Sequence, residues 1–463
     1  MNLEQLKPLN IHVIGLSAVE GSSIIEFLWS NGVRNITAHD FCKKKGFVPR
    51  FAKRNPNLKT EERKARLQIL KLPEIRKHFE DSYLTGIENA DLIFASQAWY
   101  KYKFNFPKLK DAKEKGTPFK TIINLYLDLF PGVTIGITGS NGKTTTTSLA
   151  HHVLKSLHDG QVFSSGNIDS TSQDLDKILS ASESDILILE ISNRQLKLLE
   201  DSHAAFSIVT NITENHLDEH DSFQEYAETK LRLCQGSIPI LNDKDEATKL
   251  YSKIENPIWF NNEDILKEFK LKASDYPLAG QHNLENLYAV LHLLKTLKTN
   301  GKINYENSQI KSALQSFKTP PRRLEPIGEL NGVNVINDLS STTPTSTVKA
   351  VEAFSDSAFS LVLGCDHKGG NYDELIEKLS SLQKSGVLKK IFVLPGSIRE
   401  LLHNSGLEIT NAQNFEDIAI QTSPDFGKHL LVSPSGEHVI SVHLKNKNLK
   451  KIFSICPPQQ ANT

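Results

Sequence analysis

The sequence is poor in cysteine and lacks long hydrophobic runs. Its 463 residues include four cysteines, and none of them forms a CxxC pair. This spacing argues against a structural zinc site and against a disulfide framework, so we expect a protein of the reducing cytoplasm. No apolar run approaches the ~18 residues that a membrane helix needs, and the first residues lack the pattern of a signal peptide. We therefore expect no membrane insertion.

An excess of either charge is also missing, because 54 basic residues face 54 acidic ones. This balance argues against a large nucleic-acid-binding surface and against an acidic tail. Residues 43–77 are locally rich in lysine and arginine. A solvated helical surface explains such a stretch better than an anion-binding role does. The composition favours small-molecule substrates and no nucleic-acid partner.

What the sequence does contain is a regular alternation of short apolar runs and helix-like stretches. This alternation is typical of the α/β class, in which helices cover parallel sheets. The length suggests about three domains, and we expect them to cover residues 1–130, 131–318 and 319–463. The segment Thr319-Pro320-Pro321 opens the third block, since proline interrupts regular elements.

The first block opens with an expected strand at 11–15, a helix at 21–31 and a second strand at 36–40. The glycine turn at Gly15, followed later by Asp40, partly matches a dinucleotide-binding fingerprint. The match is incomplete, because no central glycine stands between Gly15 and Gly21. This turn predicts a nucleotide-related site only weakly.

The strongest motif is the glycine loop GITGSNGKTTTT at 136–147, which follows an expected strand at 133–138 and opens a helix. Backbone N–H groups at such a helix start favour phosphate. Lys143 can reach the terminal phosphates, and the Thr144 hydroxyl is suited to Mg²⁺. The loop departs from the strict GxxxxGK[ST] pattern, because Ile137 replaces the first glycine. We predict nucleotide binding by Gly139, Ser140, Asn141, Gly142, Lys143, Thr144 and Thr145.

Further chemical side chains follow two more expected strands of this block, at 186–191 and 206–212. The carboxyl ends of parallel strands meet at one edge of a sheet, where ligands bind. Glu190 ends the first of these strands and is a candidate Mg²⁺ ligand; the alternative is a surface glutamate. His216, at the same edge, is a candidate metal or phosphate contact. Taken alone, Lys230 would be a solvated helix lysine.

Two patterns concern the core and the third block. We expect Ala150, Val153, Leu154 and Leu157 to face the core, because they recur at helical spacing. Further strands are expected at 333–337, 360–364, 391–394 and 430–433.

Together these features resemble the Mur ligase family, in order and in spacing, over essentially the whole chain. The motifs that carry the resemblance, besides Glu190, are TGSNGKTT, NITENHLDEHDSFQEYAETK, GQHNLENLYAV, RRLE and NDLSSTTPTST. The resemblance implies a Rossmann-like UDP-binding domain at 1–130, a P-loop ATP-binding domain at 131–318 and a Rossmann-like amino-acid-binding domain at 319–463. It is strongest to the members that add D-glutamate to UDP-N-acetylmuramoyl-L-alanine.

The resemblance also implies a reaction and its helpers. An ATP-dependent ligase of peptidoglycan synthesis would activate the acceptor carboxylate as an acyl phosphate, with two Mg²⁺ ions and a CO₂-derived carbamate on Lys230. We expect a monomer. The residues that match catalytic positions are Lys143, Glu190, His216, Lys230 and Lys368. The metal ligands implied are Thr144, Glu190, His216 and carbamylated Lys230.

Other implied contacts involve nucleotide and acceptor. Those to the nucleotide are Asn286, Arg323 and Asp338, and Lys368 would face the amino-acid substrate. Those to the UDP-muramoyl acceptor are Asp40, Asn167, Ser192 and Gln195.

The chain departs from the family pattern in several places. The pattern NDSKATN reads NDLSSTT at 337–343, so that Ser340 replaces a lysine, and the segment 433–441 lacks the serine and phenylalanine that hold D-glutamate. The expected SPG loop reads Ser96-Gln97-Ala98, and ELSSFQL reads EISNRQL at 190–196. These departures keep two alternatives open: a related ligase with another amino acid or acceptor, such as a folylpolyglutamate-type enzyme, and a degenerate nucleotide-binding paralogue.

Two features weigh against these alternatives. The Gly15 turn with Asp40 favours a UDP-binding domain, which folate-type ligases do not carry. A protein without catalysis would have no need of the complete set Lys143, Glu190, His216 and Lys230.

Overall fold

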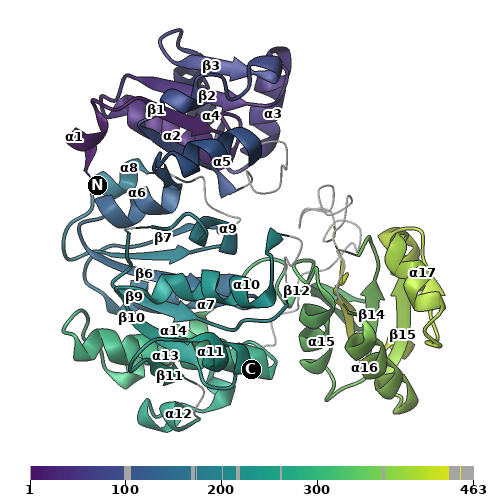
Figure 1. The fold of residues 1–463 in the computed structure, drawn as a ribbon. Helices are drawn as coiled ribbons and strands as arrows, with labels where there is room; N and C mark the ends of the chain where they lie inside the picture. Colours follow the sequence, from purple (N-terminus) through teal and green to yellow (C-terminus); the bar gives the residue numbers. More distant parts are fainter. Residues whose placement is uncertain are drawn as a thin grey trace. The chain divides into compact units, whose positions relative to one another are not determined.

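The computed structural model describes residues 2–97, 106–167, 173, 175–200, 202–214, 219–260, 263–367, 371–436 and 449. Its strands form three sheets, one in each block expected from the sequence. The chain divides into two compact units. Unit 1 comprises Met1–Ile265 and Ala289–Ile310, and unit 2 comprises Leu266–Tyr288 and Lys311–Thr463. Unit 1 contains the first two sheets and unit 2 the third (Figure 1).

The first sheet is parallel throughout, in the order β3-β2-β1-β4-β5. Its strands are β1 (Ile11–Ile14), β2 (Ile36–Asp40), β3 (Arg76–Phe79), β4 (Leu92–Ala95) and β5 (Phe119–Lys120). The helices of this block are α1 (Leu3–Leu6), α2 (Val19–Ser30), α3 (Phe47–Arg54), α4 (Thr60–Lys71), α5 (Phe106–Glu114) and α6 (Ile122–Leu129). Every residue of β1, β2 and β4 is buried, as expected for parallel strands covered on both faces. The two predicted strands and the predicted helix are confirmed to within two residues.

The second sheet is also parallel, in the order β11-β10-β9-β6-β8-β7. Its strands are β6 (Val133–Thr138), β7 (Val162–Gly166), β8 (Ile186–Glu190), β9 (Phe206–Val209), β10 (Ile238–Asn242) and β11 (Ile258–Phe260). The associated helices are α7 (Lys143–Leu157), α8 (Asp176–Leu179), α9 (Asn193–Leu196), α10 (Phe223–Leu231) and α11 (Glu246–Tyr251). The four α7 residues expected in the core are buried.

One predicted strand of this sheet, at 206–212, is three residues too long. The carbonyl of Asn211, two residues beyond the end of β9, accepts a hydrogen bond from the N–H of Ser140 in the glycine loop. The chain therefore leaves the sheet at this point and supports the glycine loop.

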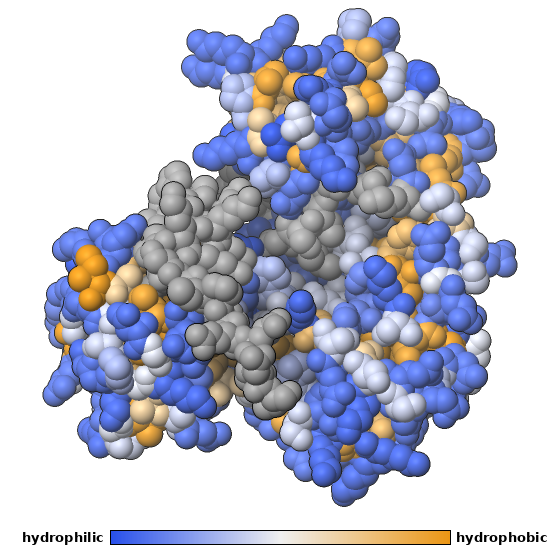
Figure 2. All heavy atoms as spheres, turned by 180° about the vertical axis from the view of Figure 1, so that it is seen from behind, coloured by the Kyte–Doolittle hydropathy of each residue, from blue (hydrophilic) through white to orange (hydrophobic). Residues whose placement is uncertain are grey.

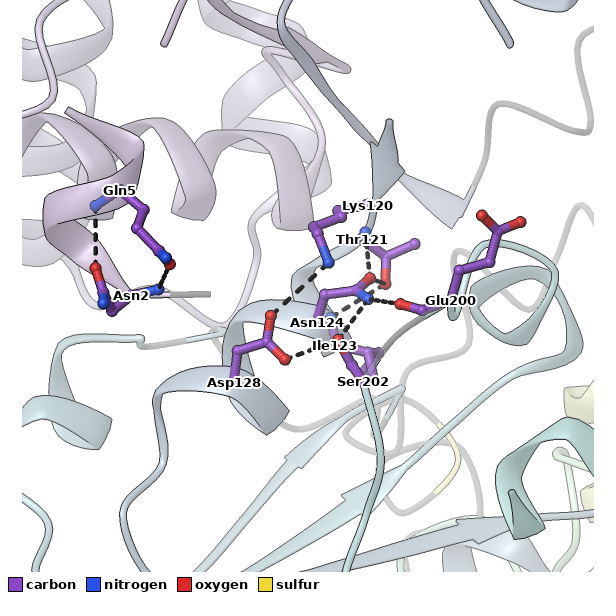
Figure 3. A network of polar contacts seen from close by, with 9 residues as sticks. All are labelled: Asn2, Gln5, Lys120, Thr121, Ile123, Asn124, Asp128, Glu200 and Ser202. Atoms are coloured by element: carbon purple, nitrogen blue, oxygen red, sulfur yellow. Dashed lines mark hydrogen bonds and ion pairs between the residues drawn. The ribbon is translucent and has the colours of Figure 1, made fainter. Parts of the chain in front are cut away.

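Helix α6 is anchored to the chain segment that precedes β9 (Figure 3). The Asn124 amide donates to the Glu200 carbonyl at 3.3 Å and to the Ser202 hydroxyl at 3.0 Å. Ser202 in turn donates to the Asp128 carboxylate at 2.8 Å, and Thr121 caps the helix. Because α6 directly follows the first sheet, these bonds tie the end of that sheet to the second one.

The third sheet has the order β12-β13-β17-β14-β15-β16. Its strands are β12 (Glu325–Leu330), β13 (Val333–Asn337), β14 (Phe359–Leu363), β15 (Leu388–Val393), β16 (Thr410–Asn411) and β17 (His429–Val432). The remaining helices are α12 (Asp264–Glu268), α13 (Gln281–Thr299), α14 (Asn307–Ser316), α15 (Pro344–Glu352), α16 (Asp373–Lys384), α17 (Ser397–His403) and α18 (Phe415–Gln421). The four predicted strands are confirmed, with ends shifted by up to three residues.

The antiparallel pairing of β12 with β13 was not predicted. The two strands are joined by Asn331 and Gly332, which have φ angles of 51° and 81°. An Asn-Gly pair with positive φ angles is a strong short-range hairpin signal, so the sequence did carry this information.

Exposed apolar side chains are scattered, and hydrophilic residues predominate on the face drawn in Figure 2. Among the described residues, the large hydrophobic side chains that are exposed lie on five different elements: Val48, Leu179, Leu250, Trp259 and Ile420. Scattered apolar residues of this kind are normal on a protein surface. Within the described part of the chain, no helix combines the length and the apolar character needed to cross a membrane.

Candidate functional site

The glycine loop lies between β6 and α7, at the centre of the second sheet. Gly142 precedes α7 with a φ angle of 83°, and Gly139 has a φ angle of 148°. A Cβ atom on Gly139 would lie 1.9 Å from Thr210 Oγ1, so only glycine fits there. The turn thus presents the N-terminus of a helix 15 residues long, a position that favours anions.

Polar side chains from neighbouring elements hold this loop in place. The N–H of Asn141 donates to Asn211 Oδ1 at 3.0 Å, and the Thr210 hydroxyl donates to the Asn141 carbonyl at 2.5 Å. The hydroxyls of Ser140 and Tyr226 are 2.9 Å apart. Because its backbone conformation is fixed by these contacts, the loop is preformed for a ligand.

Two lysines reach the loop from different helices. Lys143 Nζ donates to the carbonyls of Gly139 and Ser140, at 2.8 and 3.0 Å. Lys230 Nζ donates to the Gly139 carbonyl at 2.9 Å and lies 4.8 Å from the centre of the Tyr226 ring. The Lys230 side chain is only 1% exposed. Burial lowers its pKa well below the usual value, the nearby Lys143 charge lowers it further, and Glu190 raises it.

A carboxylate and a hydroxyl meet beside the loop. The Thr144 hydroxyl donates to Glu190 Oε2 at 2.8 Å, and Glu190 is 2% exposed at the end of β8. Oxygen donors of this kind are the ligands that Mg²⁺ prefers, so the pair fits such an ion. The described residues contain no group of three histidine, cysteine or carboxylate side chains suited to a metal.

Three of the four residues expected to contact the acceptor gather at the ends of β7 and β8. The Asn167 N–H donates to the Glu190 carbonyl at 2.7 Å, and Asn167 Nδ2 lies 3.4 Å from Glu190 Oε1. Ser192 caps α9, and its own N–H donates to Gln195 Oε1 at 3.0 Å. The three expected acceptor contacts therefore lie at the same edge of the sheet as Thr144 and Glu190, the pair that fits a Mg²⁺ ion.

The fourth residue, Asp40, lies at the end of β2 in the first sheet. Its carboxylate accepts a bond from the N–H of Ser17 at 2.8 Å and one from the N–H of Cys42 at 3.1 Å. Arg50 Nε is 3.7 Å away. Asp40 thus stabilises the turn after β1. That turn is tight, because a Cβ on Gly21 would lie 2.2 Å from the Gly15 carbonyl oxygen.

The expected nucleotide contacts Asn286, Arg323 and Asp338 belong to unit 2. Asp338 is buried, accepts a bond from the Ser433 hydroxyl at 2.8 Å and one from the Leu324 N–H at 3.2 Å. Burial raises its pKa to about 6, although Arg323 and these donors lower it. Asn286 lies on α13.

Two expected site residues, His216 and Lys368, lie outside the described residues. The same holds for residues 437–441 of the expected amino-acid pocket. The roles of His216 and Lys368 stay predictions.

The sequence did not point to Glu20 as a member of the site, and it marked Gln97 only as part of the departure from the expected SPG loop. Glu20 is buried in the first turn of α2. It accepts bonds from the N–H of Gln97 at 2.7 Å and from Gln195 Nε2 at 2.6 Å. These partners are 77 and 175 residues away in the sequence. An acidic residue in a first helical turn is common, so no local signal distinguished Glu20.

Comparison with known proteins is consistent with this geometry. The Mur ligase middle domain matches residues 137–294. A relative from Clostridioides difficile (strain 630), named UDP-N-acetylmuramoylalanine--D-glutamate ligase, is 30% identical over 397 residues, which are 79% of this chain and 84% of that protein. A relative of the same name from Solibacter usitatus is 30% identical over 321 residues, 65% of this chain and 70% of that protein.

Solved structures agree at the level of the fold. UDP-N-acetylmuramate-alanine ligase MurC from Thermotoga maritima matches with a TM-score of 0.55 at 17% identity, over 96% of this chain and 99% of that one. The MurF ligase from Thermotoga maritima, solved with ADP, matches with a TM-score of 0.52 at 16% identity, over 98% and 97%. The glycine loop and the sheet order agree with these comparisons, and the relatives are matched over most of their length. The chain therefore belongs to the Mur ligase family.

Proposed function

We propose that this chain is an ATP-dependent ligase that joins D-glutamate to UDP-N-acetylmuramoyl-L-alanine in peptidoglycan synthesis, in the cytoplasm and as a monomer. The names of the relatives from Clostridioides difficile and Solibacter usitatus support this substrate pair. The observation that carries the proposal is the meeting of Lys143, Lys230 and the Thr144–Glu190 pair at one sheet edge. The proposed domains are 1–130 for the UDP-sugar, 131–318 for ATP and 319–463 for the amino acid.

The first task of these residues is to hold phosphate. The loop from Gly139 to Thr145 would wrap the β- and γ-phosphates of ATP with its N–H groups. Lys143 would give up its hydrogen bonds to the carbonyls of Gly139 and Ser140 and would bind phosphate oxygens instead. Positive charge at this point stabilises the transfer of the phosphoryl group to the acceptor carboxylate, which gives an acyl phosphate. The neutral amine of D-glutamate then attacks the acyl carbon, phosphate leaves, and the nitrogen loses one proton as the amide forms.

The second task is to hold divalent cations. Thr144 and Glu190 would bind one Mg²⁺, and His216 with a carbamate on Lys230 would bind a second. When bound, Mg²⁺ neutralises the phosphate oxygens as two anions approach each other. A lysine whose pKa is lowered by burial is present in part as a neutral amine. That amine can add to CO₂ and release one proton, which leaves an anionic oxygen ligand.

The third task is to hold the acceptor and the amino acid. Asn167, Ser192 and Gln195 would contact the muramoyl part of the acceptor, and Asp40 would support the UDP-binding turn. In the third domain Lys368 would face D-glutamate. Asn286, Arg323 and Asp338 would contact the nucleotide.

Phosphate release from ATP tests the proposal. The purified chain is incubated with Mg²⁺, UDP-N-acetylmuramoyl-L-alanine and each member of a panel of amino acids, with a control that lacks the acceptor. Release that requires both the acceptor and D-glutamate supports the proposal. Release with a different amino acid would identify a related ligase, and ATP binding without release under any condition would refute ligase function.

A further inference from the structure

A buried carboxylate connects the first sheet to the proposed catalytic edge. Glu20 is 4% exposed, and both of its oxygens accept hydrogen bonds: Oε2 from the N–H of Gln97 at 2.7 Å and Oε1 from Gln195 Nε2 at 2.6 Å. Burial raises the pKa of Glu20, and these two donors lower it. Burying a carboxylate costs free energy unless it is well bonded. Gln97 lies in the loop after β4 of the first sheet, and Gln195 lies on α9 of the second block. The Glu20 carboxylate therefore connects the two sheets of unit 1.

Further hydrogen bonds connect the residues bonded to Glu20 with Glu190, the candidate Mg²⁺ ligand. Gln97 Nε2 donates to Asn167 Oδ1 at 2.9 Å, and Asn167 Nδ2 faces Glu190 Oε1 at 3.4 Å. The Oε1 atom of Gln97 accepts a bond from the Ser192 hydroxyl at 3.1 Å. An amide has one donor end and one acceptor end; the Glu190 carboxylate requires the NH₂ group of Asn167, and Glu20 holds the backbone N–H of Gln97. Only one orientation of the Gln97 and Asn167 amides satisfies all of these bonds.

We propose that Glu20 is a positioning residue for the acceptor site. By holding the backbone N–H of Gln97 and the side-chain amide of Gln195, it places the Gln97 side chain that donates to Asn167, and through this contact it keeps the Asn167 amide on Glu190. This inference rests on the proposed function, because the acceptor contacts belong to it. Glu20 itself need not touch any substrate.

The substitution Glu20→Gln tests the role with little change of shape. The new amide must turn its NH₂ group towards either the Gln97 N–H or Gln195 Nε2, so that two donors face each other. We expect the KM for the acceptor to rise about tenfold, which corresponds to the loss of roughly one hydrogen bond. The KM for ATP is expected to stay within about twofold of the wild type.

Glu26→Gln is the matched control. Glu26 lies on the same helix, α2, and pairs with Arg66 Nε at 2.5 Å, outside the array. We expect it to leave both KM values unchanged. An unchanged acceptor KM in Glu20→Gln would overturn the proposal, as would an equal rise in both KM values, which indicates general loss of structure.

A double variant separates bond geometry from charge. In Glu20→Gln/Gln195→Glu the donor and the acceptor change places, while the oxygen of residue 195 that accepts from Ser192 is retained. Gln195 is itself a proposed acceptor contact, so this variant is read by hydrogen–deuterium exchange of the Gln97 backbone amide. We expect faster exchange in Glu20→Gln and restored protection in the double variant. Unrestored protection would overturn the proposed geometry.

The exchange measurement also distinguishes the two proposals. A wild-type chain without ligase turnover refutes the proposed function. In that case, an unchanged exchange rate of the Gln97 backbone amide in Glu20→Gln would refute the positioning role as well. A faster exchange rate would still show that Glu20 fixes the loop that contains Gln97.

Discussion

Lys143 and Lys230 donate to the same acceptor, the carbonyl oxygen of Gly139, at 2.8 and 2.9 Å. Two ammonium groups this close repel each other, and the Lys143 charge lowers the pKa of Lys230. The proposed phosphate-binding lysine therefore helps to make Lys230 neutral. A ligand that draws Lys143 away would change the charge balance at Lys230, which couples the two proposed roles.

We expect Lys143→Ala to abolish ATP-dependent turnover, because the variant removes the charge that is proposed to neutralise the terminal phosphates of ATP. Phosphate release measures the loss. Lys155→Ala on the same helix is the control, since Lys155 is exposed at the far end of α7. Ligase activity near the wild-type level in Lys143→Ala would refute the role of the loop.

We expect Lys230→Ala to lose turnover and to regain part of it with formate or acetate. A small carboxylate can enter the space left by the side chain and supply the anionic oxygen that a carbamate would provide. Activity is measured with and without added carboxylate, with chloride as the salt control. Full activity of Lys230→Ala without any addition would exclude the carbamate.

The first sheet should lose stability in mild acid because of His12. The pKa of His12 is lowered to about 4, first by burial and then by the Arg76 and His78 charges, while Glu88 and Asp91 partly oppose this shift. The unfolded chain, with its histidine near 6.5, then binds a proton that the folded chain does not. This stabilising contribution is complete above pH 6.5 and is lost as the pH falls towards 4.

Urea unfolding between about pH 4.5 and 7.5 measures this dependence. One such histidine changes the free energy of unfolding by up to about 1.4 kcal/mol per pH unit. His12→Asn should reduce the slope, although His39, 2.9 Å from His12, also has a pKa lowered by burial. A slope identical to the wild type would contradict the assignment to His12.

The elements around the glycine loop could be predicted because their signals are local. The strand Val133–Thr138 agrees with its prediction at both ends, since a buried run of β-branched residues ends at a glycine turn. Helix α7 begins at Lys143, directly after Gly142. Phosphate-binding geometry therefore follows from a few consecutive residues.

The array around Glu20 could not be predicted in this way. Whether an acidic residue near a helix start faces water or Gln195 depends on how two sheets pack, and the two residues are 175 positions apart. The low exposure of Lys230 has the same origin: the motif gives its position, but only the fold buries it under the loop. Packing between distant segments determined what the sequence left open.

We expect Gly139→Ala to disrupt nucleotide binding without removing any functional group. The φ angle of 148° is unfavourable for alanine, and the added Cβ would lie 1.9 Å from Thr210 Oγ1. Thr210 donates to Asn141, so a shift of Thr210 would also release the loop. A cost of about 1–3 kcal/mol in stability is expected, together with weaker ATP binding.

Thermal unfolding and ATP titration of Gly139→Ala measure the two effects. Gly46→Ala is the control, because a Cβ there would meet nothing within 4 Å and its φ angle is −90°. If the contact with Thr210 causes most of the loss, Gly139→Ala/Thr210→Ser should remain impaired, since serine keeps the hydroxyl. Wild-type ATP affinity in Gly139→Ala would show that the loop tolerates a side chain at this position. In that case, the close approach between the ends of β6 and β9 does not determine the shape of the phosphate site.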